Sequence, residues 1–243
     1  MKPIAQVLRQ PLPEQEKPLT RFLCRALVAL GRRQVVSLRG AEHVLPERDP
    51  FVLAVNHNQR LEALLLPALL AFERRGRLVH FLADWPMFLV PGVGLLYRRG
   101  GVVPVAGKSA RPAFLNRLRP LFASGAPAHE KGLKLLRAGR SLGVFAEGTM
   151  NRDRHRLLRG RPGAARMAIA AGVPVVPVGI SFPGSRGGPI ADGEAMAIEI
   201  GPPLAPPAEE AAAAAFHRTI FERLAALCGK SYSPDAPRRK IHV

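Results

Sequence analysis

Two side chains that could carry acid–base chemistry follow a short apolar stretch, FVLAV, at residues 51–55. His57 comes two residues after this stretch, and Glu62 lies five positions further on, where an almost continuous apolar segment begins. An imidazole accepts protons near neutral pH, and a carboxylate reaching its second ring nitrogen would hold the tautomer that a general base needs. With no protein nucleophile in the pattern, the nucleophile would be a substrate hydroxyl, which suits transfer of an acyl group from a thioester. In most proteins, a histidine and a glutamate at this spacing alone result from chance or from helix capping.

Other site motifs are missing from the sequence. It contains no G-x-S-x-G elbow and no Walker loop, and GVGLLY from Gly92 lacks the third glycine of a dinucleotide site. The seven histidines show no metal-ligand spacing, so we expect no metal ion and no bound cofactor. The cysteines, Cys24 and Cys228, are isolated, which is typical of a reduced, cytoplasmic protein.

The chain is strongly basic. Its 36 Lys and Arg residues against 18 Asp and Glu residues give a net charge of +18 and an isoelectric point near 11.4. Such a field attracts polyanions, including anionic lipid, coenzyme A and acidic carrier proteins. Aromatic residues make up only 6%, and no nucleic-acid-binding motif is present, so we expect no nucleic acid partner.

Apolar strand-like segments alternate with helical ones along much of the sequence. The predicted strands lie at 34–40, 51–55, 78–83, 100–105, 141–148, 173–180 and 196–201, and the predicted helices at 19–34, 61–75, 129–138, 162–171 and 208–227. This alternation predicts an α/β fold, with a mixed, mostly parallel sheet flanked by helices on both faces. Sites in such sheets gather beyond the carboxyl ends of the strands, and His57 and Glu147 both follow directly after a predicted strand.

Two segments combine apolar and basic residues. Residues 1–18 are predicted to form a loose arm, followed by an amphipathic helix that either covers the core or rests on a membrane surface. Ser109 to Leu133 is a second such segment, expected to lie on a bilayer or to form a wall of an acyl groove. No apolar run is long enough to span a membrane, and no secretory signal is seen. We therefore predict a membrane-proximal region, 1–34, and a main domain, 35–243.

Four sequence blocks between residues 36 and 182 resemble, in order, those of the lysophosphatidate acyltransferase family, part of the glycerolipid acyltransferase superfamily. AVNHNQRLE resembles the N-H-x-x-x-x-D block, and GVGLLYRRGGVVPV resembles the aromatic-basic block that follows it. SLGVFAEGTMNRD resembles F-P-E-G-T-R-S, and the stretch ending VPVVPVGI resembles the last block. The resemblance implies the glycerolipid acyltransferase fold.

The resemblance also implies roles for individual residues. His57 would be the general base and Glu62 the residue that orients it. The family's acceptor-binding E-G-T matches Glu147, Gly148 and Thr149. Arg98 and Arg99 match the basic part of the second block and would bind a phosphate of the acceptor, unless they belong to an ordinary solvated basic loop.

The implied reaction transfers a fatty acyl group from acyl-CoA or acyl carrier protein to a lysophospholipid. The expected acceptor is 1-acylglycerol-3-phosphate, which gives phosphatidate, and the expected location is the cytoplasmic face of an anionic membrane, as a peripheral protein. Glu62 is one methylene longer than the family's aspartate, and Met150 replaces the arginine of E-G-T-R. These departures leave two alternatives: another lyso-lipid acceptor, such as an aminolipid or glycolipid, or a catalytically silent lipid- or polyanion-binding homologue.

Overall fold

The structure is a computed structural model that describes residues 3–122, 125–184 and 187–236. In this part of the chain, seven strands form one sheet in the order β1-β7-β6-β2-β5-β3-β4. Every neighbouring pair is parallel except β6 and β7. The strands are β1 (Val35–Arg39), β2 (Val52–Val55), β3 (His80–Asp84), β4 (Val103–Val105), β5 (Leu142–Phe145), β6 (Val175–Ser181) and β7 (Met196–Ile200). The predicted mixed, mostly parallel sheet is confirmed.

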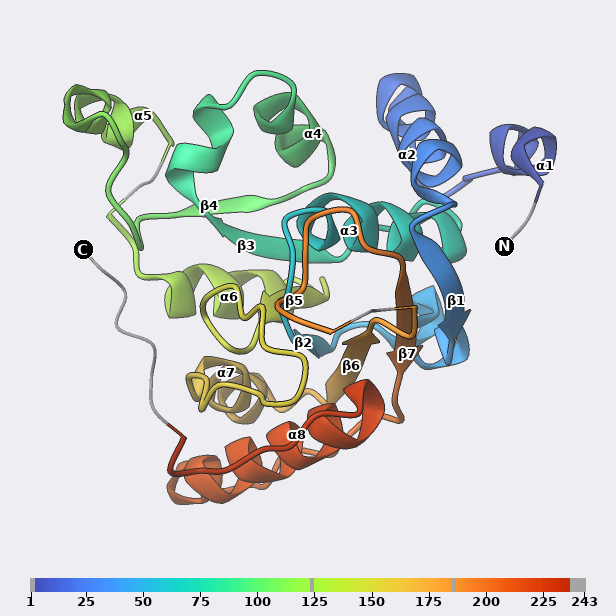
Figure 1. Cartoon of the computed structure of the whole chain (residues 1–243). Coiled ribbons are helices and arrows are strands. Elements are labelled where there is room, and N and C mark those ends of the chain that lie inside the picture. The colour runs from blue at the N-terminus through green and yellow to red at the C-terminus, as the bar shows by residue number, and fades with distance from the viewer. Residues whose placement is uncertain (1–2, 123–124, 185–186, 237–243) are drawn as a thin grey trace.

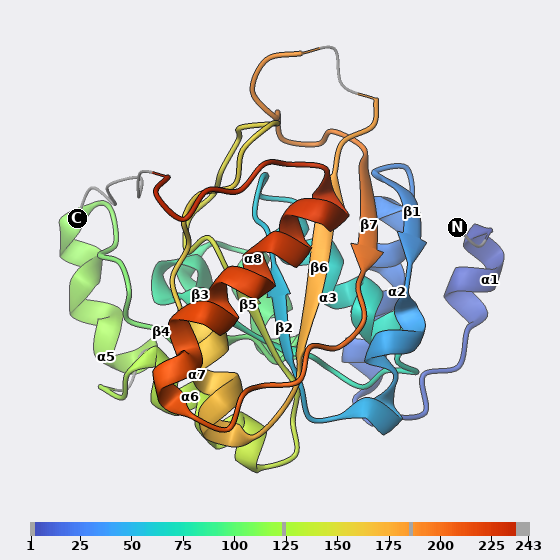
Figure 2. The ribbon, with the colours of Figure 1, turned by 90° about the horizontal axis from the view of Figure 1, so that it is seen from below.

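Helices cover both faces of the sheet (Figures 1 and 2). One face carries α2 (Pro18–Gly31), α3 (Glu62–Glu73) and α4 (Val93–Arg99), and the other carries α6 (Ala128–Arg137), α7 (Gly163–Ala171) and α8 (Ala213–Cys228). The central strand β2 is fully buried because Leu53 and Val55 pack with the first group of helices while Val52 and Ala54 pack with the second. A continuous apolar run is what a strand buried on both faces requires.

The register of the central strands explains why two distant segments meet. In the parallel pair β2 and β5, Val55 is the partner of Phe145. The residues that follow these two strands therefore leave the sheet at the same edge, side by side. His57 and Glu147 each lie two positions beyond these ends, so the topology places both at one carboxyl edge.

The N-terminal region packs on the core, so the prediction of a loose arm is wrong for residues 3–18. A short helix, α1 (Ile4–Arg9), places Val7 in the core, where this side chain is only 1% exposed. Leu12 is equally buried, and the Arg25 guanidinium of α2 binds the carbonyl of Gln10. Burial of apolar side chains, which outweighs the local polarity of the segment, holds it in place. Residues 1–2 lie outside the described residues.

The second apolar-basic segment forms short helical pieces at the edge of the sheet, η4 (Ala113–Leu118) and α5 (Arg119–Phe122). Its residues 123–124 lie outside the described part of the chain. The remaining short turns are η1 (Ala41–Val44), η2 (Pro46–Arg48), η3 (Trp85–Leu89) and η5 (Glu210–Ala212). Among the described helices, none is both long and apolar enough to cross a bilayer.

Candidate active site

His57 and Glu62 form a close pair at the carboxyl edge of the sheet. Nδ1 of His57 lies 3.0 Å from Oε2 of Glu62, the first residue of α3. The Glu62 side chain is completely buried, whereas the imidazole is 16% exposed. Because the carboxylate accepts the proton on Nδ1, the lone pair on Nε2 is available to a substrate. The sequence-predicted pair is thus brought together in the geometry of a base and the group that orients it.

The Glu62 carboxylate is held by its own neighbours. Oε2 also accepts a hydrogen bond from the backbone N–H of Asn58 at 2.7 Å, and Oε1 accepts one from the Asn58 side-chain amide at 2.9 Å. Glu62 lies in the first turn of α3, where the helix dipole favours a negative charge. These interactions fix the carboxylate in one position, so the extra methylene relative to aspartate does not leave it mobile.

The segment that carries His57 is fixed by hydrogen bonds to β6 and to the loop that follows β5. The Asn56 side chain exchanges hydrogen bonds with the backbone of Ile180, at 2.7 and 2.9 Å. The His57 carbonyl accepts a bond from the backbone N–H of Asn151, and its ring stacks on Phe145 with 4.1 Å between ring centres. The imidazole therefore has little freedom to rotate away from Glu62.

The Glu147 carboxylate holds the segment that carries His57 by hydrogen bonds. Its Oε1 accepts the backbone N–H of His57 at 3.1 Å, and its Oε2 accepts bonds from Asn151 at 2.7 Å and from the N–H of Leu158 at 2.8 Å. The residue is 5% exposed, and burial raises its pKa against the opposing effect of these bonds and of the Lys230 charge. Through these contacts Glu147 fixes the loop that carries His57. A direct contact between Glu147 and an acceptor stays a prediction.

The E-G-T turn follows β5 at the same edge. Gly148 has φ of +71°, a conformation that favours glycine, and its N–H bonds to the carbonyl of Phe145. Thr149 comes next and is half-buried. The side chain of Arg161 runs beside this turn, since its Cδ and Nε lie 3.5 Å from the position that a Cβ on Gly148 would occupy.

Arg98 and Arg99 are not brought to this edge. They end α4 just before β4, and line a cleft with residues that precede β3 and β5, including Arg77 and Arg140. These positions are at the amino ends of the parallel strands, whereas His57 and Glu147 follow their carboxyl ends. The Arg98 guanidinium lies over the Phe122 ring, at 5.4 Å from its centre. The geometry gives no support to a phosphate clamp formed by this pair beside His57.

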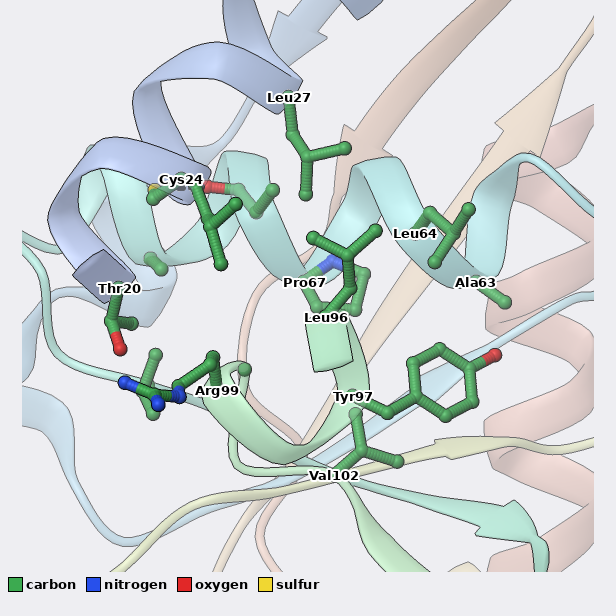
Figure 3. A pocket seen from close by; sticks show the side chains of 15 residues that line it. Thr20, Cys24, Leu27, Ala63, Leu64, Pro67, Leu96, Tyr97, Arg99 and Val102 are labelled. Carbon is green, nitrogen blue, oxygen red and sulfur yellow. Dashed lines mark hydrogen bonds between the residues drawn. The ribbon is translucent and has the colours of Figure 1, made fainter. Parts of the chain in front are cut away.

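An apolar groove runs along α3 (Figure 3). It has about 460 Å³ of unfilled space, part of it open to solvent, and is lined from α2, α3 and α4 and the turn after α4. Ala63 and Leu64, the residues after Glu62, lie at one end, while Thr20 and Arg99 lie close together at the other. Between Ala63 and Ala71, α3 rises about 12 Å. Residues 109–122 are not among those that line this groove.

Three site residues carried no signal that the sequence reasoning used. Asn58 and Arg161 lie inside two of the matched blocks, and this position could have identified them. Lys230, which binds the Asn58 amide oxygen at 2.6 Å, lies 172 positions away in the chain and could not be connected with the site from the sequence. Within the described residues, no three His, Cys, Asp or Glu side chains are grouped to hold a metal ion, and a metal-free reaction stays a prediction.

The structure thus combines an α/β sheet, covered by helices on both faces, with a close histidine–carboxylate pair at the carboxyl edge of its central strands. A family model described as Acyltransferase matches residues 36–181, more than half of the sequence. The chain therefore belongs to the acyltransferase family, which confirms the resemblance read from its four blocks.

The proteins to which the chain is similar include a curated relative and a solved structure. The 1-acyl-sn-glycerol-3-phosphate acyltransferase of Borreliella burgdorferi is 27% identical over 143 residues, or 59% of this chain and 50% of the relative. The chain thus matches about half the length of this curated relative. The crystal structure of the 1-acyl-sn-glycerophosphate acyltransferase PlsC from Thermotoga maritima superposes with a TM-score of 0.57 at 21% identity, covering 85% of this chain and 75% of that one. At this identity, the structural likeness supports the fold.

Proposed function

We propose that the protein transfers a fatty acyl group from an acyl thioester to the free hydroxyl of a lysophospholipid. The observation that carries this proposal is the buried Glu62 carboxylate 3.0 Å from Nδ1 of His57. The two residues that follow Glu62 in α3, Ala63 and Leu64, line an apolar groove. The relative from Borreliella burgdorferi is described as acting on 1-acyl-sn-glycerol-3-phosphate, which makes this compound the first acceptor to test. Its acylation would give phosphatidate.

In the proposed reaction, Nε2 of His57 removes the proton of the acceptor hydroxyl as its oxygen attacks the thioester carbonyl. The resulting imidazolium is stabilised by Glu62. As the tetrahedral intermediate collapses, the carbon–sulfur bond breaks and the thiol leaves with the proton that His57 had taken. A new ester is formed and no acyl-enzyme is needed, so the pair suffices without a nucleophilic side chain.

The groove suits the hydrocarbon part of a substrate. Its lining is predominantly apolar, with Leu27, Leu64 and Leu96 facing one another across it (Figure 3). Burial of each methylene of a fatty chain there contributes about 0.8 kcal/mol. A chain lying in the groove would leave its reactive end near Glu62 and thus near His57.

Met150 leaves open how the phosphate of an acceptor is held. Methionine provides no charged donor, and Arg152 is already bound to Asp192 and to the carbonyl of Ile190. Arg161 is the best-placed cation, because its exposed side chain lies along the turn that contains Gly148. A guanidinium binds a phosphate through two parallel hydrogen bonds. If the acceptor lacks a phosphate, as in the aminolipid or glycolipid alternative, Arg161 has no such role.

The proposed function is tested by thiol release from palmitoyl-CoA and from palmitoyl acyl carrier protein, with and without lysophosphatidate. We expect release to depend on the acceptor.

Arg161→Ala should raise KM for lysophosphatidate about ten- to a hundredfold, the worth of a hydrogen bond to a charged group. KM for the thioester should change little.

Arg98→Ala is the matched control, since it removes an arginine at the other end of the sheet and should leave KM for lysophosphatidate unchanged.

In the thiol-release assay, faster release with a lyso-aminolipid or lyso-glycolipid than with lysophosphatidate would support the alternative acceptor. Absence of acceptor-dependent release with every combination would favour the silent homologue.

A membrane surface is the expected source of the lipid acceptor. Apolar side chains stand exposed on α2, with Phe22 at 61% and Leu30 at 78%, and on the η4–α5 segment, with Phe114 at 67% and Leu121 at 78%. Both segments lie on the same side of the sheet as α4 (Figure 1). Exposed apolar side chains beside arginines are typical of a surface that inserts shallowly into an anionic bilayer.

Replacing Phe22 and Leu30 by aspartate should weaken binding to anionic vesicles, because two apolar contacts are lost and two negative charges are added. The unfolding temperature should change little, since both side chains are exposed. Cosedimentation with vesicles at low and high salt measures the effect, and salt should partly release the unchanged protein because each basic contact is worth about 1 kcal/mol. Leu45→Asp, at an exposed position outside these helices, is the control. Equal binding of the variant and the unchanged protein would contradict a membrane role for this surface.

A further inference from the structure

A lysine lies buried directly behind the catalytic pair. Lys230 follows the end of α8, where Gly229 takes a left-handed conformation with φ of +67°. The residue is only 6% exposed, an unusual environment for an ammonium group unless it is paired. Its Nζ donates to the Asn58 side-chain oxygen at 2.6 Å and to the Asp153 carbonyl at 2.5 Å. The cost of burying this charge is thus offset within the site.

The bond between Lys230 and Asn58 determines which way the asparagine amide points. An ammonium group has only donors, so it must meet the oxygen of the amide. The NH₂ group is then directed to Oε1 of Glu62, at 2.9 Å. With the amide turned over, its oxygen would face the carboxylate and both acceptors would repel each other. A line of hydrogen bonds therefore runs from Lys230 through Asn58 and Glu62 to Nδ1 of His57.

The charges around Lys230 favour the same arrangement of Lys230, Asn58 and Glu62. Two carboxylates, Glu62 and Glu147, are buried at this edge of the sheet, and both act electrostatically on Lys230. Burial lowers the pKa of Lys230, while the carboxylates of Glu147, Glu62 and Asp153 oppose that shift. A positive charge behind the pair offsets the cost of holding two carboxylates out of water.

We propose that Lys230 is a positioning residue for the active site: it fixes the Asn58 amide and thereby the Glu62 carboxylate that orients His57. This inference rests on the proposed function for its kinetic consequences, but its structural consequence can be measured separately. It assigns to the segment after α8 a part in the site, although that segment lies beyond the matched blocks of sequence.

The main test replaces Lys230 by methionine, which keeps most of the length and removes the donors and charge. We expect kcat to fall about ten- to a hundredfold, as for loss of a hydrogen bond to a charged group, with little change in KM for either substrate. Lys131→Met is the matched control, because Lys131 also donates to a backbone carbonyl, that of Pro104, away from the site. It should leave kcat unchanged.

A double-mutant cycle with Asn58→Ala separates this role from simple anchoring of the Asp153 loop. If Lys230 acts through Asn58, Lys230→Met should cost little more in kcat once the Asn58 amide is gone. If it only anchors the loop, the two losses should add. Additive losses, or a folded Lys230→Met protein with unchanged kcat, would overturn the proposal.

Proton NMR of the imidazole gives a readout that needs no turnover. The proton of His57 Nδ1, bonded to a buried carboxylate, should give a downfield resonance that weakens or broadens in Lys230→Met and stays unchanged in Lys131→Met. If Lys230→Met does not fold, Lys230→Gln keeps one donor for the Asn58 oxygen and should retain the signal. An unaltered resonance in a folded Lys230→Met protein counts against the proposal. Unchanged protein that shows the resonance but no acyl transfer would instead refute the proposed function alone.

Discussion

Replacing His57 by alanine should lower kcat for acyl transfer about 10²- to 10⁴-fold, the usual worth of a positioned general base. The imidazole is the only part of the pair that reaches solvent, and its Nε2 has no partner among the described residues, so alanine leaves no group to take the hydroxyl proton. Binding of both substrates should persist, since the groove is lined by other residues. Initial rates of thiol release at saturating acceptor measure the effect.

His129→Ala is the control for this experiment, because His129 is exposed on α6 and lies outside the site. The His57 variant should keep its circular dichroism spectrum and most of its thermal stability, since the loop is held by Asn56, Glu147 and Asn151 and not by the imidazole alone. A well-folded His57→Ala protein with near-normal kcat would exclude histidine as the base.

Replacing Glu62 by glutamine should reduce kcat by two to four orders of magnitude as well, for a different reason. The carboxylate accepts three hydrogen bonds, from His57 and from two groups of Asn58, whereas glutamine offers one oxygen. The new NH₂ group takes the place either of Oε1, where it meets the NH₂ group of Asn58, or of Oε2, where it meets the Asn58 N–H and Nδ1 of His57. In the second orientation the NH₂ group donates to Nδ1. The imidazole can accept this bond only as the tautomer with its proton on Nε2, which cannot serve as a base. In a serine protease, the equivalent change costs about 10⁴-fold.

Glu62→Asp keeps the charge but withdraws the carboxylate by one methylene, so its loss should be smaller than that of the glutamine variant. Because Glu62 is fully buried, thermal unfolding has to accompany the kinetics of both variants. Equal rates for the glutamine variant and the unchanged protein, at equal stability, would show that Glu62 does not orient the base. A larger loss with aspartate than with glutamine would show that distance matters more than charge.

Local patterns in the sequence were sufficient to predict the sheet and the edge at which the pair lies. Apolar runs such as the one before Asn56 are long enough for a strand and too short for a helix, and the helical segments between them imply parallel strands. Parallel strands have their carboxyl ends at one edge, so the sequence predicts that His57 and Glu147 lie at the same edge of the sheet. The spacing from His57 to Glu62 needs only the turn between a strand and a helix, which is a local feature.

The role of the arginines could not be taken from the resemblance. Arg98 and Arg99 directly precede a predicted strand, so the rule for parallel strands places them at the amino edge of the sheet, away from His57. The structure puts them at the amino ends of β3 and β5 and places Arg161 beside Gly148. The prediction of a loose N-terminal arm was wrong because its few apolar residues, such as Val7, pack in the core. The sequence does not show which residues these side chains contact.

The sequence by itself thus determined the seven strands, the longer helices, their order and the residues that can exchange a proton, because these depend on side-chain type and on spacing within one or two turns. Only the tertiary structure decided which cations approach the site. The contact between Lys230 and Asn58 joins residues 172 positions apart, and it forms because α8 packs across the sheet and ends near the carboxyl end of β2. A buried ammonium and a buried carboxylate stabilise each other only when packing brings them together and excludes water. That condition is a property of the folded chain as a whole, and no local pattern of residues records it.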